Sequence, residues 1–258
     1  MPVTGVQTCA LPISYGATDQ PYVASLRELL GLIGAHEWRR KGVEVAALNE
    51  RIHPHYGVFS PVRSEYIDLV AAAPLPALDR AFDIGTGTGV LAALLARRGV
   101  QKIIATDVDA RALACARDNL KRLGLAPQVD AVQADLFPLA PLRAPLIVCN
   151  PPWLPGRPSS PLEHAIYDLD SRMLRGFLGG LASRLTPGGE GWLILSDFAE
   201  HLGLRTRETL VGWIDAAGLR VLDRIDAQPR HPKAADATDP LYEARSAEVT
   251  SLWRLTSL

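Results

Sequence analysis

Cysteine is scarce in this chain of 258 residues: there are three, and none of them lies in a C-x-x-C pair. This excludes a disulfide framework and a thiolate metal site, and it indicates a reducing, cytoplasmic compartment. The formal net charge is only −1, so a polynucleotide substrate would need a local basic patch. No apolar run reaches the ~18 residues of a membrane span, and no membrane partner is expected.

Metal ligands are also scarce. His53 and His55 stand two residues apart, before Gly57. No further ligands follow at a spacing that would complete a metal site. We therefore expect loop histidines and no bound metal.

The bulk composition, 48% hydrophobic and 21% charged, is that of an ordinary globular protein. Its length suits one large domain with a small extension. Residues 3–14 match the in-frame translation of a sequencing-adapter primer, so we expect 1–14 to be an artefact that replaces the native start. On this interpretation 15–51 is a truncated N-terminal helical extension. Residues 52–258 form the main domain.

The stretch 82–91 organises the rest of the chain. A short apolar strand breaks into glycines at every second position, Gly85, Gly87 and Gly89, and then runs into a helix. Glycine reaches backbone angles that other residues avoid, and a side chain here would block the approach of a ligand to the backbone. The free N–H groups of the following helix face the same loop. The pattern predicts a ligand cradle.

The glycine spacing argues against a nicotinamide dinucleotide. That fingerprint is G-x-G-x-x-G, whereas this chain has G-x-G-x-G followed by Val90. Asp83 stands two residues before the first glycine. A carboxylate there would repel a pyrophosphate but suits a cationic ligand.

Strand and helix patterns alternate regularly after Pro76. The alternation predicts an α/β fold, a doubly wound and mostly parallel seven-stranded sheet with helices on both faces and an antiparallel last strand. The expected strands are 81–84, 102–106, 129–133, 145–149, 191–196, 219–225 and 248–255. The expected helices between them include 88–98, 110–123, 171–185 and 205–217. An N-terminal helix is expected over 22–33, ending near Gly34.

Polar residues fall at or near the carboxyl ends of four expected strands: Asp83, Asp107, Asp135 and Asn150. Ligands of such sheets bind at that edge. Asp107 lies 22 positions after Gly85, where a carboxylate can accept both hydroxyls of a ribose. Both nicotinamide and S-adenosylmethionine (SAM) enzymes use this feature, so it does not discriminate between them.

The tetrapeptide Asn150-Pro151-Pro152-Trp153 directly follows the fourth strand. The side-chain oxygen of Asn150 and the carbonyl of Pro151 are two acceptors for the two N–H bonds of a planar NH2 group. Holding that group would aim its lone pair and stabilise the positive charge that develops on nitrogen. Trp153 offers a flat surface for stacking. No strong base is needed, because the nitrogen becomes acidic once it is alkylated.

These two motifs resemble a known family. D-x-G-x-G-x-G resembles motif I of the class I SAM-dependent methyltransferases. N-P-P-W resembles motif IV of the amino-methylating group with the methyltransferase small domain, such as release-factor glutamine and ribosomal-RNA guanine-N2 methyltransferases. The resemblance covers about 52–225 and implies that Asn150, Pro151, Pro152 and Trp153 are catalytic. The cofactor residues that it implies are Asp83, Gly85, Thr86, Gly87, Thr88, Gly89, Asp107, Val108, Asp135, Leu136 and Asn150.

The resemblance also assigns parts of the ligand site. Asp83 would lie near the methionine end of SAM, and Asp135-Leu136 would hold the adenine amino group. The segment 57–65 resembles the one that covers the cofactor in these families and shapes the substrate entrance, which makes Ser60 and Arg63 substrate residues. Its alternative is a helix cap by Ser60 or Ser64.

Two further segments are expected near the substrate. The loop 154–170, with Tyr167, is expected to wall the acceptor. The insertion 228–247 either does the same or is a solvent loop between antiparallel strands.

The resemblance implies a SAM-dependent N-methyltransferase that acts on a macromolecular acceptor. The acceptor is either a protein glutamine or a base of ribosomal RNA, guanine or adenine, and protein is favoured because the chain is not basic. Trp153 leaves this choice open, because the glutamine enzymes usually carry Tyr there and the guanine enzymes Phe. The alternatives are an NAD-dependent oxidoreductase, which Val90 and the tetrapeptide disfavour, and a non-catalytic SAM- or RNA-binding module.

Overall fold

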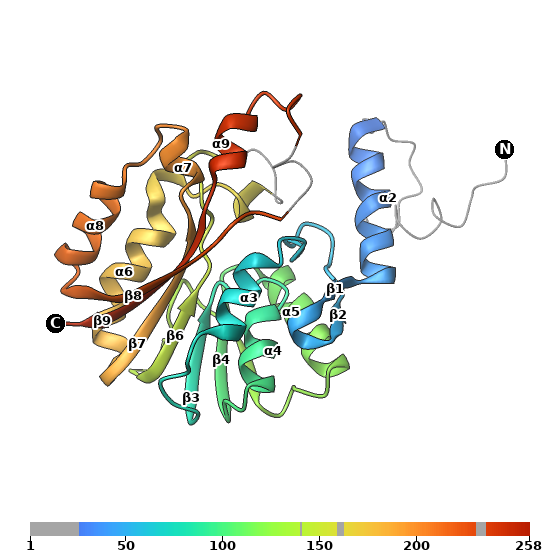
Figure 1. Cartoon of the computed structure of the whole chain (residues 1–258). Coiled ribbons are helices and arrows are strands. Elements are labelled where there is room, and N and C mark those ends of the chain that lie inside the picture. The colour runs from blue at the N-terminus through green and yellow to red at the C-terminus, as the bar shows by residue number, and fades with distance from the viewer. Residues whose placement is uncertain (1–25, 140, 159–162, 231–235) are drawn as a thin grey trace, which may run out of the picture.

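The computed structural model describes residues 26–139, 141–158, 163–230 and 236–258. Within these residues, seven strands form one sheet in the order β5-β4-β3-β6-β7-β9-β8 (Figure 1). Its strands are β3 (Arg80–Ile84), β4 (Lys102–Asp107), β5 (Val129–Gln133), β6 (Ala144–Cys149), β7 (Leu185–Ser196), β8 (Leu219–Ala227) and β9 (Thr250–Ser257). The pairings from β5 through to β7 are parallel, and β9 runs antiparallel to both of its neighbours, β7 and β8. The predicted fold class is confirmed.

Helices cover both faces of the sheet. They are α3 (Glu65–Ala72), α4 (Val90–Arg97), α5 (Ala110–Arg122), α6 (Arg172–Arg184), α7 (Phe198–His201), α8 (Arg207–Ala216) and α9 (Tyr242–Ala247), with short 3-10 turns η1 (Ala46–Leu48), η2 (Glu163–Ala165) and η3 (Leu169–Ser171). One core lies between the sheet and helices α3, α4 and α5, and the other lies against α6 and α8.

Strand β6 shows how the sequence builds these two cores. Side chains alternate across a strand, so Leu146 and Val148 enter the first core while Ile147 and Cys149 enter the second. All four are fully buried. A strand that is covered on both faces has to be apolar throughout, and this fixes β6 in the centre of the sheet.

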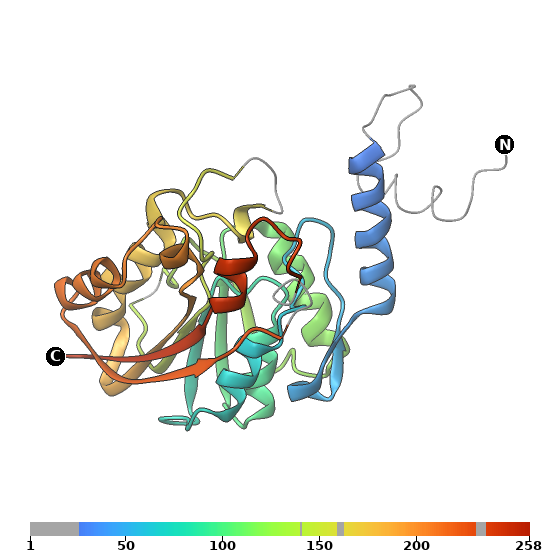
Figure 2. The ribbon, with the colours of Figure 1, turned by 45° about the horizontal axis from the view of Figure 1, so that its top comes forward.

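The N-terminal helix extends further along the chain than the sequence predicted. Helix α2 (Leu26–Lys41) runs through Gly34, so the expected end near that residue is wrong. A glycine inside a helix costs only about 1 kcal/mol, and Glu37 supports the last turns through ion pairs with Arg40 and Lys41 at helical spacing. The helix stands apart from the sheet (Figure 2) and leads into the hairpin of β1 (Val43–Val45) and β2 (Glu50–Ile52). The expected artefact at 1–14 lies outside the described residues.

Strand β7 begins at Leu185, six residues before its expected start. Ala144 pairs with Leu185 and Leu146 with Glu190, so extra residues of β7 bulge out opposite β6. Pro187 lies in this bulge, where its missing N–H costs no ladder hydrogen bond. The sequence therefore predicted where helix α6 ends but not that β7 begins directly after it.

No helix among the described residues is both long enough and apolar enough to cross a membrane.

Candidate active site

The glycine loop connects β3 to α4 and is fixed by the end of β4. The N–H groups of Gly85 and Thr86 both donate to the carbonyl of Thr106, over 2.9 and 2.8 Å. The φ angles of Gly85, Gly87 and Gly89 are +73°, +56° and +80°. Side chains rarely adopt this left-handed backbone, so the sequence needs glycine at all three positions.

The three glycines have different surroundings. A Cβ added at Gly87 would meet nothing within 4 Å, so the backbone there faces open space. A Cβ at Gly89 would lie 3.1–3.2 Å from Ala116 of α5, and one at Gly85 would lie 2.5 Å from the Met173 side chain of α6. From the sequence, all three glycines were expected to leave room for a ligand. Of the three, only Gly87 faces open space. At the other two, a side chain would crowd Met173 of α6 or Ala116 of α5.

Asp83 lies beneath the loop and is 1% exposed. Its Oδ2 accepts hydrogen bonds from Thr86 Oγ1 at 2.7 Å and from the N–H of Ala92 at 3.1 Å. Burial raises the pKa of this carboxyl from 3.8 to about 6, against the lowering effect of the two hydrogen bonds. The carboxylate thus joins strand, loop and helix, and it places negative charge below the cradle.

Asp107, at the end of β4, binds the same loop. Its Oδ2 accepts the N–H of Gly87 at 3.0 Å and its Oδ1 accepts the N–H of Asp109 at 2.9 Å. Burial raises the pKa of this carboxyl. Each carboxylate oxygen has capacity for a second donor, so hydroxyl groups of a ligand in the cradle can still bind. Val108 follows with its side chain 68% exposed.

Asp135 and Leu136 lie after β5, beyond the end of β4. The Asp135 carboxylate pairs with Arg172 at 2.6 Å, with both side chains largely exposed. Such a pair is weak, so a ligand amine can compete for the carboxylate. Leu136 has a left-handed backbone, φ +68°, and its carbonyl accepts Thr106 Oγ1 at 2.5 Å.

The tetrapeptide lies at the same edge of the sheet as the glycine loop. Strand β6 pairs with β3, and Cys149 is the partner of Ile84. Asn150 and Gly85 each follow one residue later, so the register brings the two motifs together. The Trp153 Nε1–H donates to Oδ1 of Asn150 over 2.9 Å. The sequence predicted the two residues as a catalytic pair but not this hydrogen bond.

The segment before α3 reaches this motif through Arg63. Its guanidinium carbon lies 5.2 Å from the ring centroid of Trp153. The same guanidinium binds the buried carboxylate of Glu248. Ser60 contributes its carbonyl to the N–H of Val62. Ser64 occupies the N-cap position of α3 without a side-chain cap bond.

The loop after Trp153 closes on itself. Leu154 pairs with Tyr167 in a parallel bridge, and the Tyr167 ring lies against Gly156. Asp168 is buried and its two carboxylate oxygens accept the N–H groups of Met173 and Leu174 at 2.9 and 3.1 Å. Asp168 thereby fixes the start of α6, the helix whose Met173 covers Gly85.

Asn119, which the sequence did not single out, holds the other side of the cradle. This buried residue of α5 donates to the carbonyls of Thr88 and His53 and accepts the N–H of His53. His55 lies nearby, 3.1 Å from Asp118. No local sequence pattern indicates this clamp, because its partners are distant in the chain. In the described parts of the chain no group of three or more His, Cys, Asp or Glu residues could hold a metal.

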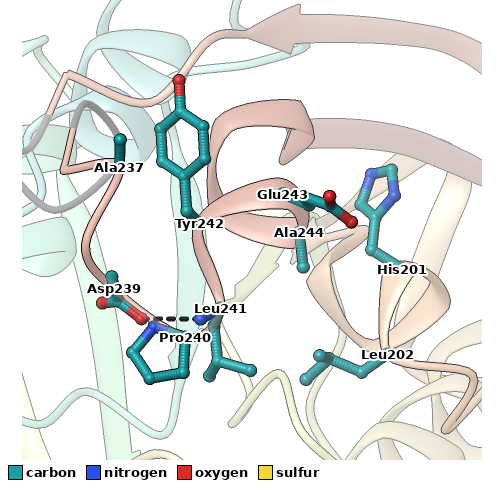
Figure 3. Close-up of a pocket in the computed structure, with 9 residues that line it drawn as sticks. All are labelled: His201, Leu202, Ala237, Asp239, Pro240, Leu241, Tyr242, Glu243 and Ala244. Atoms are coloured by element: carbon teal, nitrogen blue, oxygen red, sulfur yellow. Dashed lines mark hydrogen bonds between the residues drawn. The ribbon is translucent and has the colours of Figure 1, made fainter.

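A separate cavity of about 570 Å³ lies between α7 and the second half of the 228–247 insertion (Figure 3). It is lined by His201, Leu202, Ala237 and residues 239–244. None of these residues belongs to the glycine loop or the tetrapeptide. The described part of the insertion therefore forms a hollow of its own beside α7.

Comparison with known proteins gives one family. The profile of the methyltransferase small domain matches residues 49–206. The release factor glutamine methyltransferase of Cereibacter sphaeroides is 31% identical over 183 residues, which are 65% of this chain and 63% of that protein. Ribosomal RNA small subunit methyltransferase C of Pseudomonas aeruginosa is 34% identical over 148 residues, which are 56% of this chain and 41% of that protein. Both matches span less than two thirds of the relative's length.

The fold also has solved counterparts. The ribosomal protein L11 methylase of Lactobacillus delbrueckii subsp. bulgaricus superposes with a TM-score of 0.53 and 15% identity. The superposition covers 80% of this chain and 85% of that one. At this identity the likeness concerns the fold.

Proposed function

The chain belongs to the methyltransferase small domain family, and we propose that it is a SAM-dependent N-methyltransferase acting on a planar amino or amide nitrogen. The observation that carries the proposal is the position of Asn150. Its side-chain oxygen bonds Trp153 at the sheet edge where the glycine loop leaves the neighbouring strand. The activity is assigned to residues 52–258, with 15–51 as an extension.

The residues present fit SAM. Gly87 leaves its backbone open to a ligand, Asp107 can accept ribose hydroxyls, and the buried charge of Asp83 favours a cation in the cradle. When bound, SAM supplies a methyl group activated by a positively charged sulfur. Further contacts are proposed for Gly85, Thr86, Thr88, Gly89, Val108, Asp135 and Leu136. A nicotinamide cofactor suits this set less well. Its G-x-G-x-x-G fingerprint requires a third glycine at position 90, where this chain has Val90.

The chemistry of this chain is to hold an NH2 group. The carbonyl of Pro151 and the free acceptor position on Asn150 Oδ1 take its two N–H bonds, which turns the nitrogen lone pair toward the cradle. The same oxygens stabilise the positive charge that develops on nitrogen. The alkylated nitrogen then loses a proton to water, and no side-chain base is required. Trp153, Ser60, Arg63 and Tyr167 are the proposed surroundings of the acceptor.

The acceptor is proposed to be a glutamine side chain of a protein. Both a release-factor enzyme and an RNA enzyme are among the relatives, and the near-zero net charge of −1 favours the protein. The low cysteine content supports a cytoplasmic location.

Labelled SAM, offered with separate pools of release-factor protein and ribosomal RNA, tests this function. We expect label in the protein pool. Label in RNA alone would move the proposal to the nucleic-acid acceptor. Calorimetry adds the cofactor test: binding of NADH with no binding of S-adenosylhomocysteine would overturn the assignment.

A further inference from the structure

Glu248 is a fully buried carboxylate, 0% exposed, between the end of α9 and the start of β9. Its Oε1 accepts Arg63 Nη1 at 2.5 Å and Ser196 Oγ at 2.6 Å, and its Oε2 accepts Arg63 Nη2 at 3.3 Å. Ser196 Oγ in turn accepts the N–H of Phe198, the first residue of α7. One buried charge therefore joins the start of β9 and the end of β7 to the segment before α3.

Arg63 connects Glu248 to the tetrapeptide. Its guanidinium lies 5.2 Å from the centre of the Trp153 ring, and the Trp153 indole N–H donates to Asn150 Oδ1. The fork of hydrogen bonds to Glu248 fixes the plane of the guanidinium. A planar cation held in this way favours one orientation of the ring that it covers, and the ring also packs against both cores.

Stability alone does not account for this ion pair. Removing two charges from water costs about as much as their attraction returns, and apolar residues of similar size serve the fold as well. What the ion pair does supply is a fixed position for the Arg63 guanidinium beside Trp153. The indole N–H is a donor only, so a fixed Trp153 selects the oxygen of the Asn150 amide and keeps the amide from turning over.

We propose that Arg63 and Glu248 are positioning residues that fix the Trp153 indole and, through its N–H, the Asn150 carboxamide in the orientation that accepts an NH2 group. The inference rests on the proposed function and deepens it. It moves Arg63 from direct contact with the acceptor to the support of Trp153. It also ties the segment that follows the 228–247 insertion to the chemistry of Asn150.

A second cluster of a glutamate, an arginine and a tryptophan, on β7 and β9, serves as a control. Glu190 accepts Arg254 at 2.7 and 2.9 Å and the Trp192 indole N–H at 2.8 Å. This trio has the same three residue types as Glu248, Arg63 and Trp153. None of its residues belongs to the tetrapeptide or the glycine loop.

The first readout is the indole N–H spectrum of the full-length protein, in which the Trp153 signal is the one lost in Trp153→Phe. In Glu248→Gln and in Arg63→Lys we expect this signal to shift and its hydrogen exchange to quicken about tenfold. In Glu190→Gln the Trp192 signal should move instead. An unshifted Trp153 signal in both site variants would overturn the proposal. Arg63→Lys decides the question if Glu248→Gln does not fold.

The second readout is the rate of a single methyl transfer, with S-adenosylhomocysteine affinity measured by calorimetry. Glu248→Gln should lower the rate about tenfold and leave the affinity within twofold. In a Trp153→Phe background the same change should alter the rate less than twofold, because the contact it acts through is already absent. An equal loss in Glu190→Gln would contradict the positioning role. If the wild-type chain transfers no methyl group, the proposed function fails, and the indole spectrum alone decides whether Arg63 and Glu248 fix Trp153.

Discussion

The indole nitrogen of Trp153 donates a hydrogen bond to the side-chain oxygen of Asn150 over 2.9 Å. The two residues sit three positions apart, at opposite ends of a dipeptide of prolines whose φ angles are fixed. The aromatic residue of the tetrapeptide is therefore more than a flat surface for stacking. On our proposal it also determines which atom of Asn150 faces the acceptor.

Replacing Trp153 by phenylalanine tests this dual role, because the change keeps an aromatic ring and removes the donor. We expect the single-turnover rate of methyl transfer to fall about tenfold, with S-adenosylhomocysteine affinity unchanged. Trp38→Phe, on the exposed surface of α2, is the control. Equal rates for the wild type and Trp153→Phe would show that stacking alone is sufficient.

The glycine loop gives a second prediction, because the surroundings of Gly87 and Gly89 differ. Gly87→Ala should cost about 1–2 kcal/mol of unfolding free energy for its left-handed backbone and lower S-adenosylhomocysteine affinity at least about tenfold. Gly89→Ala should cost about 2–4 kcal/mol, since the added methyl group also meets Ala116. Urea denaturation and calorimetry measure the two effects. Equal losses of stability and affinity in both variants would contradict the assigned roles.

Asp83 predicts a pH dependence of stability. Burial raises its pKa from 3.8 to about 6, so the folded state binds this proton more tightly than the unfolded state does. The stabilising contribution is complete below pH 3.8 and is lost as the pH rises through about 6. Relative to Asp83→Asn, the wild type should therefore lose roughly 2–3 kcal/mol of unfolding free energy between pH 4 and pH 7. Urea denaturation measures the unfolding free energy of both proteins as a function of pH. Parallel curves would contradict the raised pKa of Asp83.

The sequence was informative where local pattern decides structure. The apolar run of β6 and the alternation after Pro76 predicted the strands of the sheet, whereas the register of β6 on β3 was seen only in the structure. Helix α2 was predicted too short because a single glycine was given more weight than the ion pairs of Glu37. The bulge at Pro187 depends on pairing with β6, which no local pattern contains.

In the candidate site, too, residues in local motifs could be predicted from the sequence and residues held by distant partners could not. The glycines, Asp107 and the tetrapeptide stand out in the sequence because their spacing is local. Arg63 and Glu248 are 185 positions apart, and nothing near either residue indicates its partner. The role of Asn119 is hidden for the same reason, since its partners at His53 and Thr88 lie 66 and 31 positions away. Contacts of this kind emerge only once the fold brings the segments together.

The most direct test of the account is the rate of a single methyl transfer from labelled SAM by Asn150→Ala, with S-adenosylhomocysteine affinity measured on the same protein. Removing the acceptor that holds the NH2 group should lower the rate at least about 100-fold while the affinity stays within about threefold. A variant that binds the cofactor and transfers methyl groups at the wild-type rate would contradict the assignment of Asn150, and with it the proposed mechanism.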